Sequence, residues 1–516
     1  MHEGDARAGR PVVGRRLGGW HEPEAVFLAL FAAESAGDVA WVDDSAGEGW
    51  SYLAASAGTT VEWPRGVFAG LAELLPASAL PSAVPPSARD ADDHDALPDG
   101  LAFRLGLVGW IPHDAWTETV PLHHAPVTAV VDADADAARP VPAAAMRVDR
   151  LLAFDHAAGE VWAVARAGDP WPCAVEEVLA RAASAGARPV QPAEASDAHA
   201  HADLPPLWRH DDDAYLDLIR SCQESIRRGD AYQLCLTNSA AVPGVVDPVR
   251  VHVALRALSP THHGAFLRIG GTVLVSASPE RFVEVDAGGT LRTLPIKGTR
   301  PRHADPAADA RARADLLASE KERAENVMIV DLMRNDLSRV CVLGSVRVTS
   351  LFAVEAYAQV HQLVSRVEGE LAPGVSAVDA VRALFPAGSM TGAPKSAAVG
   401  ILHALERGPR GVYAGAFGWF GDDGRADLAM VIRSVVVTDG RATVGAGGGI
   451  TALSVPEEEL DEVRVKAAPL LAAVRAGRVE SPRGGRTAPH PPLPSAPDPA
   501  RAAAPPTGSG PHPRVH

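Results

Sequence analysis

Lysine is scarce in this chain of 516 residues: only Lys297, Lys321, Lys395 and Lys466 occur, and arginine supplies the other permanent positive charges. Such a bias is typical of GC-rich coding drift, which replaces lysine wherever a positive charge is enough. A guanidinium stays charged, whereas an amine can lose its proton and attack carbon. Unless the four are simply what drift has left, they are candidates for chemistry. Lys297, in segment 295–299 (Pro-Ile-Lys-Gly-Thr), is the strongest, whereas Lys321 lies in a charged run typical of a solvated helix face.

Glu280 is a candidate proton donor. It follows an apolar run at 273–277 that predicts a strand, within the segment Ser-Pro-Glu-Arg-Phe at 278–282. A carboxyl at the end of a buried strand is half removed from water, which raises its pKa and suits it to general acid catalysis. An ordinary turn carboxylate is the competing interpretation.

Two glutamates could bind a metal ion. Glu325 lies on an otherwise apolar helical face, where an acid needs a cation or a proton. Glu462 lies on a second predicted helix, four residues before Lys466. Carboxylates from two helices would make a hard-oxygen site, for which Mg²⁺ is the natural occupant. Ordinary ion pairs with neighbouring basic residues are the alternative for both.

Two further features could bind an anion. A glycine-rich run at 444–450 follows a predicted strand, and successive backbone N–H groups in such a run can converge on an anion. A bulged, glycine-rich strand is the plainer interpretation. Arg433 is predicted on the apolar face of a strand, where a guanidinium needs a carboxylate from a substrate or from within the protein.

The elements that must position these residues are predicted from periodicity and turn signals. An amphipathic helix is predicted at 211–228, a strand at 231–237, a hairpin at 272–285 and a long helix at about 307–338. Strands at 430–437 and 442–445 flank Asp439-Gly440, a strong signal for a type I′ hairpin.

The chain divides by composition into four parts. Residues 1–190 show mixed strand and helix patterns, 191–207 form a linker rich in Pro, Ala and His, and 208–477 carry the tightest patterns and all the candidates above. Residues 478–516, rich in Pro, Ala and Arg, are expected to be a disordered tail.

Composition excludes several classes of function. The net charge is −16 and no basic face is apparent, so nucleic acid is not an expected partner. The apolar runs are too short to cross a bilayer and no leader pattern is apparent, so we expect a cytoplasmic protein without a membrane partner. The four cysteines lack metal-site spacing and are expected to be reduced, buried thiols.

Together these segments resemble the chorismate-utilising enzymes, a family that includes anthranilate, aminodeoxychorismate, isochorismate and salicylate synthases. The matching segments, in family order, are 229–233, 278–281, 331–337, 384–395, 413–418, 432–434 and 447–466. The resemblance implies a large α+β fold of two subdomains. Two antiparallel sheets would pack together, with helices outside and both halves of the chain contributing.

The resemblance also implies the roles of the site residues. Magnesium would lie on Glu325 and Glu462 and bridge to the ring carboxylate of chorismate, while Glu280 would protonate the departing C4 hydroxyl. The other implied substrate-binding residues are Gln233, Gly298, Thr299, Tyr413, Arg433, Gly447, Gly448 and Lys466.

Two positions distinguish between members of the family. Isochorismate and salicylate synthases carry a lysine base where this chain has Gln233, which cannot take a proton near pH 7, so amination is favoured over hydration. Aminodeoxychorismate synthases resemble Pro-Ile-Lys-Gly-Thr at 295–299, whereas anthranilate synthases have alanine at the lysine. If the amine of Lys297 attacks C2 first, ammonia can enter at C4 and expel it. That role needs a neutral amine, so we expect burial to lower the pKa of Lys297; a charge contact with the substrate is the alternative.

The expected product is therefore 4-amino-4-deoxychorismate, for p-aminobenzoate and folate or for a secondary metabolite. Many relatives resemble His-Leu-Val-Ser where this chain has Gln362 before Leu363, and the loss of that histidine fits an enzyme that stops at this intermediate, although His361, one position earlier, could still line the site. None of the four cysteines lies in a Gly-x-Cys-x-Gly elbow, so we expect a separate glutaminase subunit to supply ammonia.

Three alternatives stay open. The chain could be an anthranilate synthase component I or a 2-amino-2-deoxyisochorismate synthase, which aminate C2. It could be a degenerate paralogue that binds chorismate and regulates without catalysis, although the intact set of candidate residues speaks against this. Inhibition by tryptophan is not expected, because the Leu-Leu-Glu-Ser pattern is missing, but a structural tryptophan is possible.

Overall fold

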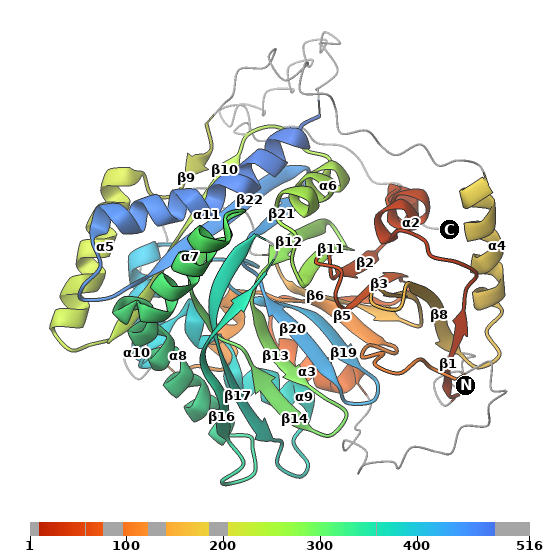
Figure 1. Cartoon of the computed structure of the whole chain (residues 1–516), viewed down its shortest axis with the longest axis horizontal. Helices are drawn as coiled ribbons and strands as arrows, with labels where there is room; N and C mark the ends of the chain where they lie inside the picture. The colour runs from red at the N-terminus through yellow and green to blue at the C-terminus, as the bar shows by residue number, and fades with distance from the viewer. Residues whose placement is uncertain are drawn as a thin grey trace, which may run out of the picture. The chain divides into compact units, whose positions relative to one another are not determined.

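Two large sheets, antiparallel throughout, form the centre of the computed structural model (Figure 1). The structure describes residues 10–56, 58–75, 96–121, 141–184, 205–357 and 359–479. The predicted linker at 191–207 and tail at 478–516 lie outside these residues, apart from 205–207 and 478–479. Strands from before residue 190 and after residue 207 occur in both sheets. The two-sheet α+β fold implied by the resemblance is confirmed.

The first sheet has twelve strands. Their order is β1 (Val12–Arg16), β8 (Glu160–Arg166), β7 (Arg150–Asp155), β3 (Trp50–Ala55), β2 (Val39–Asp43), β11 (His263–Ile269), β12 (Thr272–Ser278), β21 (Ser434–Thr438), β22 (Arg441–Ile450), β10 (Gln233–Val242) and β18 (Gly392–Ala393), with β9 (Leu207–Trp208) also paired to β10.

The second sheet has ten strands. Their order is β15 (Ile296–Pro301), β17 (Val360–Glu370), β14 (Thr290–Thr293), β13 (Arg281–Val285), β20 (Ala426–Met430), β19 (Ala416–Gly421), β5 (Gly106–Ile111), β6 (Ala143–Val148) and β4 (Thr60–Trp63), with β16 (Arg347–Ala356) also paired to β17.

Helices cover the outer faces of both sheets (Figure 1). The twelve-stranded sheet packs against α2 (Pro23–Leu30), α4 (Trp171–Ser184), α5 (Asp212–Arg227), α6 (Pro248–Leu258), α10 (Lys395–Glu406) and α11 (Pro456–Ala476). The ten-stranded sheet packs against α3 (Val67–Leu74), α8 (Glu320–Ser338) and α9 (Ala377–Leu384), and α7 (Pro306–Ala318) contacts β15. Three 3₁₀ turns, η1 (Glu34–Ala36), η2 (His113–Glu118) and η3 (Gly388–Met390), complete the order.

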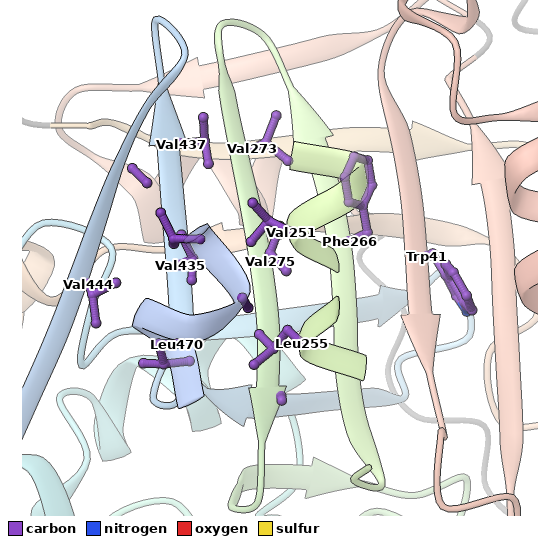
Figure 2. Packing of buried hydrophobic residues seen from close by; sticks show 14 of the residues in the cluster. Trp41, Val251, Leu255, Phe266, Val273, Val275, Val435, Val437, Val444 and Leu470 are labelled. Carbon is purple, nitrogen blue, oxygen red and sulfur yellow. The ribbon is translucent and has the colours of Figure 1, made fainter. Parts of the chain in front are cut away.

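Alternation along the central strands divides the core into layers. On β11, Phe266 faces the helices while Ala265 and Leu267 face the second sheet, and Val273 and Leu274 of β12 point to opposite sides in the same way. Both faces are buried, so these strands are apolar at consecutive positions. Figure 2 shows the helix-facing layer, in which side chains of α6 and α11 lie on the valines of β12, β21 and β22. Burying each large side chain contributes about 2 kcal/mol.

Several local predictions are confirmed. The helix predicted at 211–228 is α5, with Tyr215, Ile219 and Cys222 buried. Strands β21 and β22 form the predicted hairpin, and Asp439 and Gly440 have φ of 50° and 71°, as a type I′ turn requires. The strand predicted at 231–237 exists as β10, displaced to Gln233–Val242.

Other local predictions are wrong. The residues predicted as a hairpin at 272–285 form β12 and β13, which belong to different sheets, because the chain crosses between the sheets at Pro279-Glu280. The helix predicted at 307–338 is two helices, since Ser319 is extended and its hydroxyl accepts the Glu322 N–H to begin α8. Cys173 is exposed rather than buried.

Arg433 is not on a strand, as the sequence predicted. It lies between β20 and β21 with φ of 50°, a left-handed conformation that interrupts what periodicity indicated as one continuous strand.

Within the described residues, no helix combines the length and apolar character needed to cross a membrane.

Candidate active site

The predicted chemical residues gather where β15 of one sheet approaches β22 and β10 of the other. A methyl group built on Gly449 of β22 would lie 3.5 Å from the Lys297 Nζ and would collide with the side-chain amide of Gln233. Only glycine at 449 leaves this space to the two side chains. The folded chain thus brings together residues more than 60 positions apart in sequence.

A β-bulge aims Lys297 into this space. The register between β15 and β17 shifts between Ile296 and Thr299, so Lys297 and Gly298 stand outside the regular pairing. Gly298 has φ of +85°, and a Cβ there would lie 2.8–2.9 Å from Leu316 and Glu322, so glycine is needed on both counts. Thr299 returns to the ladder opposite Gln362, with its side chain exposed at the rim.

The expectation of a lowered pKa for Lys297 is wrong. Burial does lower it, but the negative charges of Glu325, Glu280 and Glu462, together with Cys235, raise it above the ordinary value overall. The sequence argument counted desolvation and left out the number of carboxylates that the fold places around the amine. Without ligands, Lys297 is therefore an ammonium ion.

Glu280 lies at the crossover between β12 and β13, with 7% of its surface exposed. Burial raises its pKa to about 7, against the opposing effects of Lys297, Ser389 and Lys466. A carboxyl that holds its proton near pH 7 and lies beside Lys297 is suited to protonating a leaving hydroxyl group.

This raised pKa predicts a stability effect. The folded-state pKa of about 7 lies above the ordinary 4.5, so ionisation at high pH opposes folding. Above both values the buried carboxylate costs about 3 kcal/mol, and this penalty vanishes below pH 4.5. We expect Glu280→Gln to raise the free energy of unfolding in urea by about this amount at pH 8 and by much less at pH 5. An equal change at both pH values would contradict the assignment.

Glu325 and Glu462 differ in their surroundings. Glu325 of α8 is 8% exposed, burial raises its pKa, and no hydrogen-bond donor among the described residues reaches its carboxylate. Glu462 of α11 is 45% exposed and lies 2.5 Å from the Lys466 Nζ; burial raises its pKa but the charge of Lys466 lowers it more, so the net shift is downward.

These two carboxylates fit a magnesium ion. The almost buried Glu325 carboxylate accepts no hydrogen bond from the described residues, although the charges of Lys297 and Lys321 act on it, so it can still accept a cation. Oxygen is the ligand that Mg²⁺ prefers. The described residues contain no cluster of three or more His, Cys, Asp or Glu side chains arranged for a metal. Mg²⁺ commonly takes only one or two protein carboxylates and fills its remaining positions with water and an anionic substrate.

Comparison with known proteins places the chain in a family. A model described as chorismate binding enzyme matches residues 75–472. The chain belongs to the chorismate-binding enzyme family. It is 40% identical to an aminodeoxychorismate synthase of Streptomyces pristinaespiralis, over 88% of this chain and 64% of that protein. It is 38% identical to anthranilate synthase component 1 of Streptomyces coelicolor, over 72% of this chain and 73% of that protein.

A solved structure agrees with this membership. Anthranilate synthase component I from Streptococcus pneumoniae superposes with a TM-score of 0.64 at 27% identity, covering 82% of this chain and 92% of that one. The present chain spans 64% and 50% of the lengths of two Streptomyces aminodeoxychorismate synthases that it matches, and 28% of that of Arabidopsis thaliana.

Helix α11 and strand β22 form one wall of the candidate site, and they carry residues that the family resemblance implies for binding the substrate carboxylates. Lys466 donates from Nζ to the Gly447 carbonyl at 2.8 Å, and Arg433 donates to the Lys466 carbonyl at 3.3 Å. Gly448 lies beside Glu459, since a Cβ at 448 would be 2.9 Å from its Oε2. The glycines belong to a regular strand paired with β10, so the bulge considered from the sequence is not present.

Arg433 and Tyr413 lie close to this wall. Burial lowers the pKa of Arg433, and no carboxylate among the described residues lies within ion-pair distance of it. The internal acid weighed from the sequence is thus not its partner here, and an external carboxylate would fit. The Tyr413 ring packs directly on Gly445, where any side chain would overlap it.

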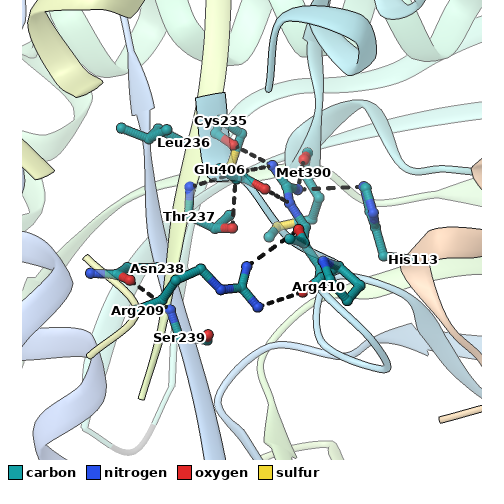
Figure 3. Close-up of polar contacts among 12 residues, drawn as sticks. His113, Arg209, Cys235, Leu236, Thr237, Asn238, Ser239, Met390, Glu406 and Arg410 are labelled. Carbon is teal, nitrogen blue, oxygen red and sulfur yellow. Dashed lines mark hydrogen bonds and ion pairs between the residues drawn. The ribbon is translucent and has the colours of Figure 1, made fainter. Parts of the chain in front are cut away.

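A buried polar network supports the strand that carries Gln233 (Figure 3). Arg410 donates to the carbonyls of Cys235 and Met390 at 2.8 and 2.7 Å and pairs with Glu406 at 2.7 Å. Glu406 also accepts from the Thr237 N–H and hydroxyl. These contacts tie β10 to η3 and fix the backbone behind the site.

Sequence reasoning did not predict one ion pair near the candidate metal ligands. Lys321 is half exposed, as its predicted solvated face requires, but it also pairs with the buried Glu459. The only sequence signal was the position of each residue one turn before a predicted metal ligand. His361 contacts Asp309 of α7 at 3.0 Å rather than a predicted catalytic residue. Lys395 forms a buried pair with Asp336 at 2.6 Å, which is a structural role.

Proposed function

We propose that this chain catalyses the Mg²⁺-dependent amination of chorismate at C4, which gives 4-amino-4-deoxychorismate. The observation that carries the proposal is the placement of Lys297 beside Gly449 and Gln233, among the carboxylates of Glu280, Glu325 and Glu462. The match to relatives named aminodeoxychorismate synthase supports the same activity.

Amination rather than hydration follows from Gln233. Its side chain is 1% exposed, and its Oε1 has no hydrogen-bond partner in the described part of the chain. A buried amide cannot remove a proton from water, but its oxygen can accept a hydrogen bond from ammonia. Ammonia needs no base, because its lone pair is already free.

In the proposed reaction, the Lys297 amine attacks C2 of chorismate. Both ring double bonds shift and the C4–O bond breaks, while Glu280 protonates the hydroxyl so that it leaves as water. Ammonia then forms a bond to C4, both double bonds shift back, and the C2–N bond breaks to release Lys297. Two allylic displacements move the amine to C4 and leave the enzyme unchanged apart from proton transfers.

The attack requires a neutral amine at Lys297. The nearby carboxylates hold it charged in the metal-free chain. Glu325 and Glu462 would hold Mg²⁺, which would supply positive charge to the ring carboxylate and cancel the influence of these two acids on Lys297. Arg433 and Lys466 would orient the substrate through its carboxylates.

A separate glutaminase subunit would supply the ammonia. A cytoplasmic location stays a prediction.

The nearest alternative reaction is amination at C2, because the chain also matches an anthranilate synthase component over most of both lengths. The presence of a lysine at 297 favours C4.

Product identification tests the proposal. The purified chain, incubated with chorismate, Mg²⁺ and an ammonium salt at alkaline pH, should form 4-amino-4-deoxychorismate, and a lyase that removes pyruvate should convert this to p-aminobenzoate. Anthranilate or 2-amino-2-deoxyisochorismate in the chromatogram would reject C4 amination. Saturable chorismate binding without turnover would indicate the regulatory paralogue.

A further inference from the structure

Lys321 and Glu459 form an ion pair between α8 and α11, with 3.4 Å between Nζ and Oε1. The Glu459 side chain is 4% exposed, whereas that of Lys321 is 49% exposed. The other oxygen of Glu459 lies close to Gly448 of β22, where a Cβ would be 2.9 Å from it. A buried carboxylate therefore depends on a lysine that reaches in from the surface.

This pair lies one helical turn before the proposed metal ligands. Lys321 and Glu325 are four residues apart on α8, and Glu459 and Glu462 are three apart on α11, so each two share a helix face. The ammonium group thus faces the same gap as the metal carboxylates. Burial lowers the pKa of Lys321, but the charges of Glu459, Glu325 and Glu462 outweigh it and keep the group charged.

We propose that Lys321 is an internal cation that weakens and thereby sets the affinity of the site formed by Glu325 and Glu462 for a divalent metal ion. The inference rests on the metal site of the proposed function. In the metal-free chain, the lysine supplies part of the positive charge that these carboxylates require.

The electrostatic repulsion between Lys321 and the bound metal ion should outweigh any benefit that the Lys321–Glu459 ion pair brings by positioning the two helices. Only the Lys321 side of the pair is half exposed, so the pair holds the two helices less firmly than a fully buried pair would. A single charge close to a divalent ion, in a partly solvated site, changes affinity by about tenfold. Removal of Lys321 should therefore tighten metal binding, whereas loss of a purely structural clamp would weaken it.

The test is a calorimetric titration of the full chain with Mg²⁺. For Lys321→Met we expect a Kd about tenfold lower than wild type at low ionic strength, with a smaller difference in 0.5 M salt, where the Debye length falls to about 4 Å. Lys321→Arg keeps the charge and should match wild type. Arg334→Met removes an exposed charge from the same helix, about 20 Å further along, and should also leave the Kd unchanged.

A double variant separates charge from structure. Lys321→Met combined with Glu459→Gln removes one positive and one negative charge, so the Kd should return to within about threefold of wild type. In EDTA, Lys321→Met alone should lower the Tm, because Glu459 is left buried without its partner, and saturating Mg²⁺ should raise the Tm more than in wild type.

Two results would overturn the inference, and they are distinguishable. If wild type binds Mg²⁺ and Lys321→Met binds it equally or more weakly, Lys321 does not set the affinity, while the proposed metal site stands. If wild type does not bind Mg²⁺, or if Glu462→Gln binds it as tightly as wild type does, both the inference and the metal site of the proposed function are wrong.

Discussion

Lys297→Ala should lower the rate of 4-amino-4-deoxychorismate formation by at least about a thousandfold, because the covalent route loses its nucleophile. The variant segment reads Pro-Ile-Ala-Gly-Thr, which resembles the anthranilate synthases, so residual product should carry its amine at C2. The measurement is product chromatography with saturating ammonium, and mass spectrometry of the acid-quenched wild type should find a chorismate-derived adduct on the peptide that contains Lys297.

Lys297→Arg is the control that separates covalent from electrostatic roles. It retains the positive charge among Glu280, Glu325 and Glu462 but provides no free amine. If the lysine acts only as a charge contact with the substrate, this variant should keep much of the activity. We expect it to be as inactive as the alanine variant, and full activity in either one would remove the covalent step.

Glu462→Gln should weaken Mg²⁺ binding at least about a hundredfold and lower turnover at limiting Mg²⁺ to the same extent, because it removes one of two proposed protein ligands. Calorimetry and activity measured across a range of Mg²⁺ concentrations would check this. Asp461→Asn makes the same charge change at a neighbouring, 69% exposed position and should have little effect.

Glu325→Gln, a variant of the other proposed metal ligand, provides a second test of the metal site. Because burial raises the pKa of Glu325 more than the charges of Lys297 and Lys321 lower it, a neutral side chain there should make the metal-free chain more stable at pH 8 while Mg²⁺ binding is lost. A variant that is more stable and yet inactive cannot owe its inactivity to misfolding. Undiminished Mg²⁺ affinity in both glutamate variants would place the metal elsewhere.

Local chemistry explains which features could be predicted. The apolar spacing of α5 and the Asp439-Gly440 turn depend on nearest neighbours, and the structure contains both. The hairpin predicted across Ser278-Pro279-Glu280 failed because two adjacent apolar runs look alike whether they pair with each other or enter different sheets. Only long-range pairing with β21 and β20 separates β12 from β13.

At the candidate site, too, some features follow from nearby residues and others depend on long-range contacts. Residue types made Lys297, Glu280, Glu325 and Glu462 candidates, but plainer interpretations stayed open for each, and their roles came from the family resemblance and remain predictions. The protonation of Lys297 could not be predicted, because it depends on the summed charge of glutamates from three distant elements. The ion pair of Lys321 could not be predicted for the same reason, because its partner lies on another helix, 138 residues away, although the expected solvation of Lys321 agrees with its half-exposed side chain.

By itself, the sequence determined the family resemblance, the helices and turns set by neighbouring residues, and the inventory of groups able to do chemistry. The tertiary structure alone decided how the strands divide between two sheets, the bulge that aims Lys297, and which charges surround each ionisable group. The physical reason is range: backbone preferences act over a few residues, whereas burial and Coulomb interactions sum over every group that folding brings near.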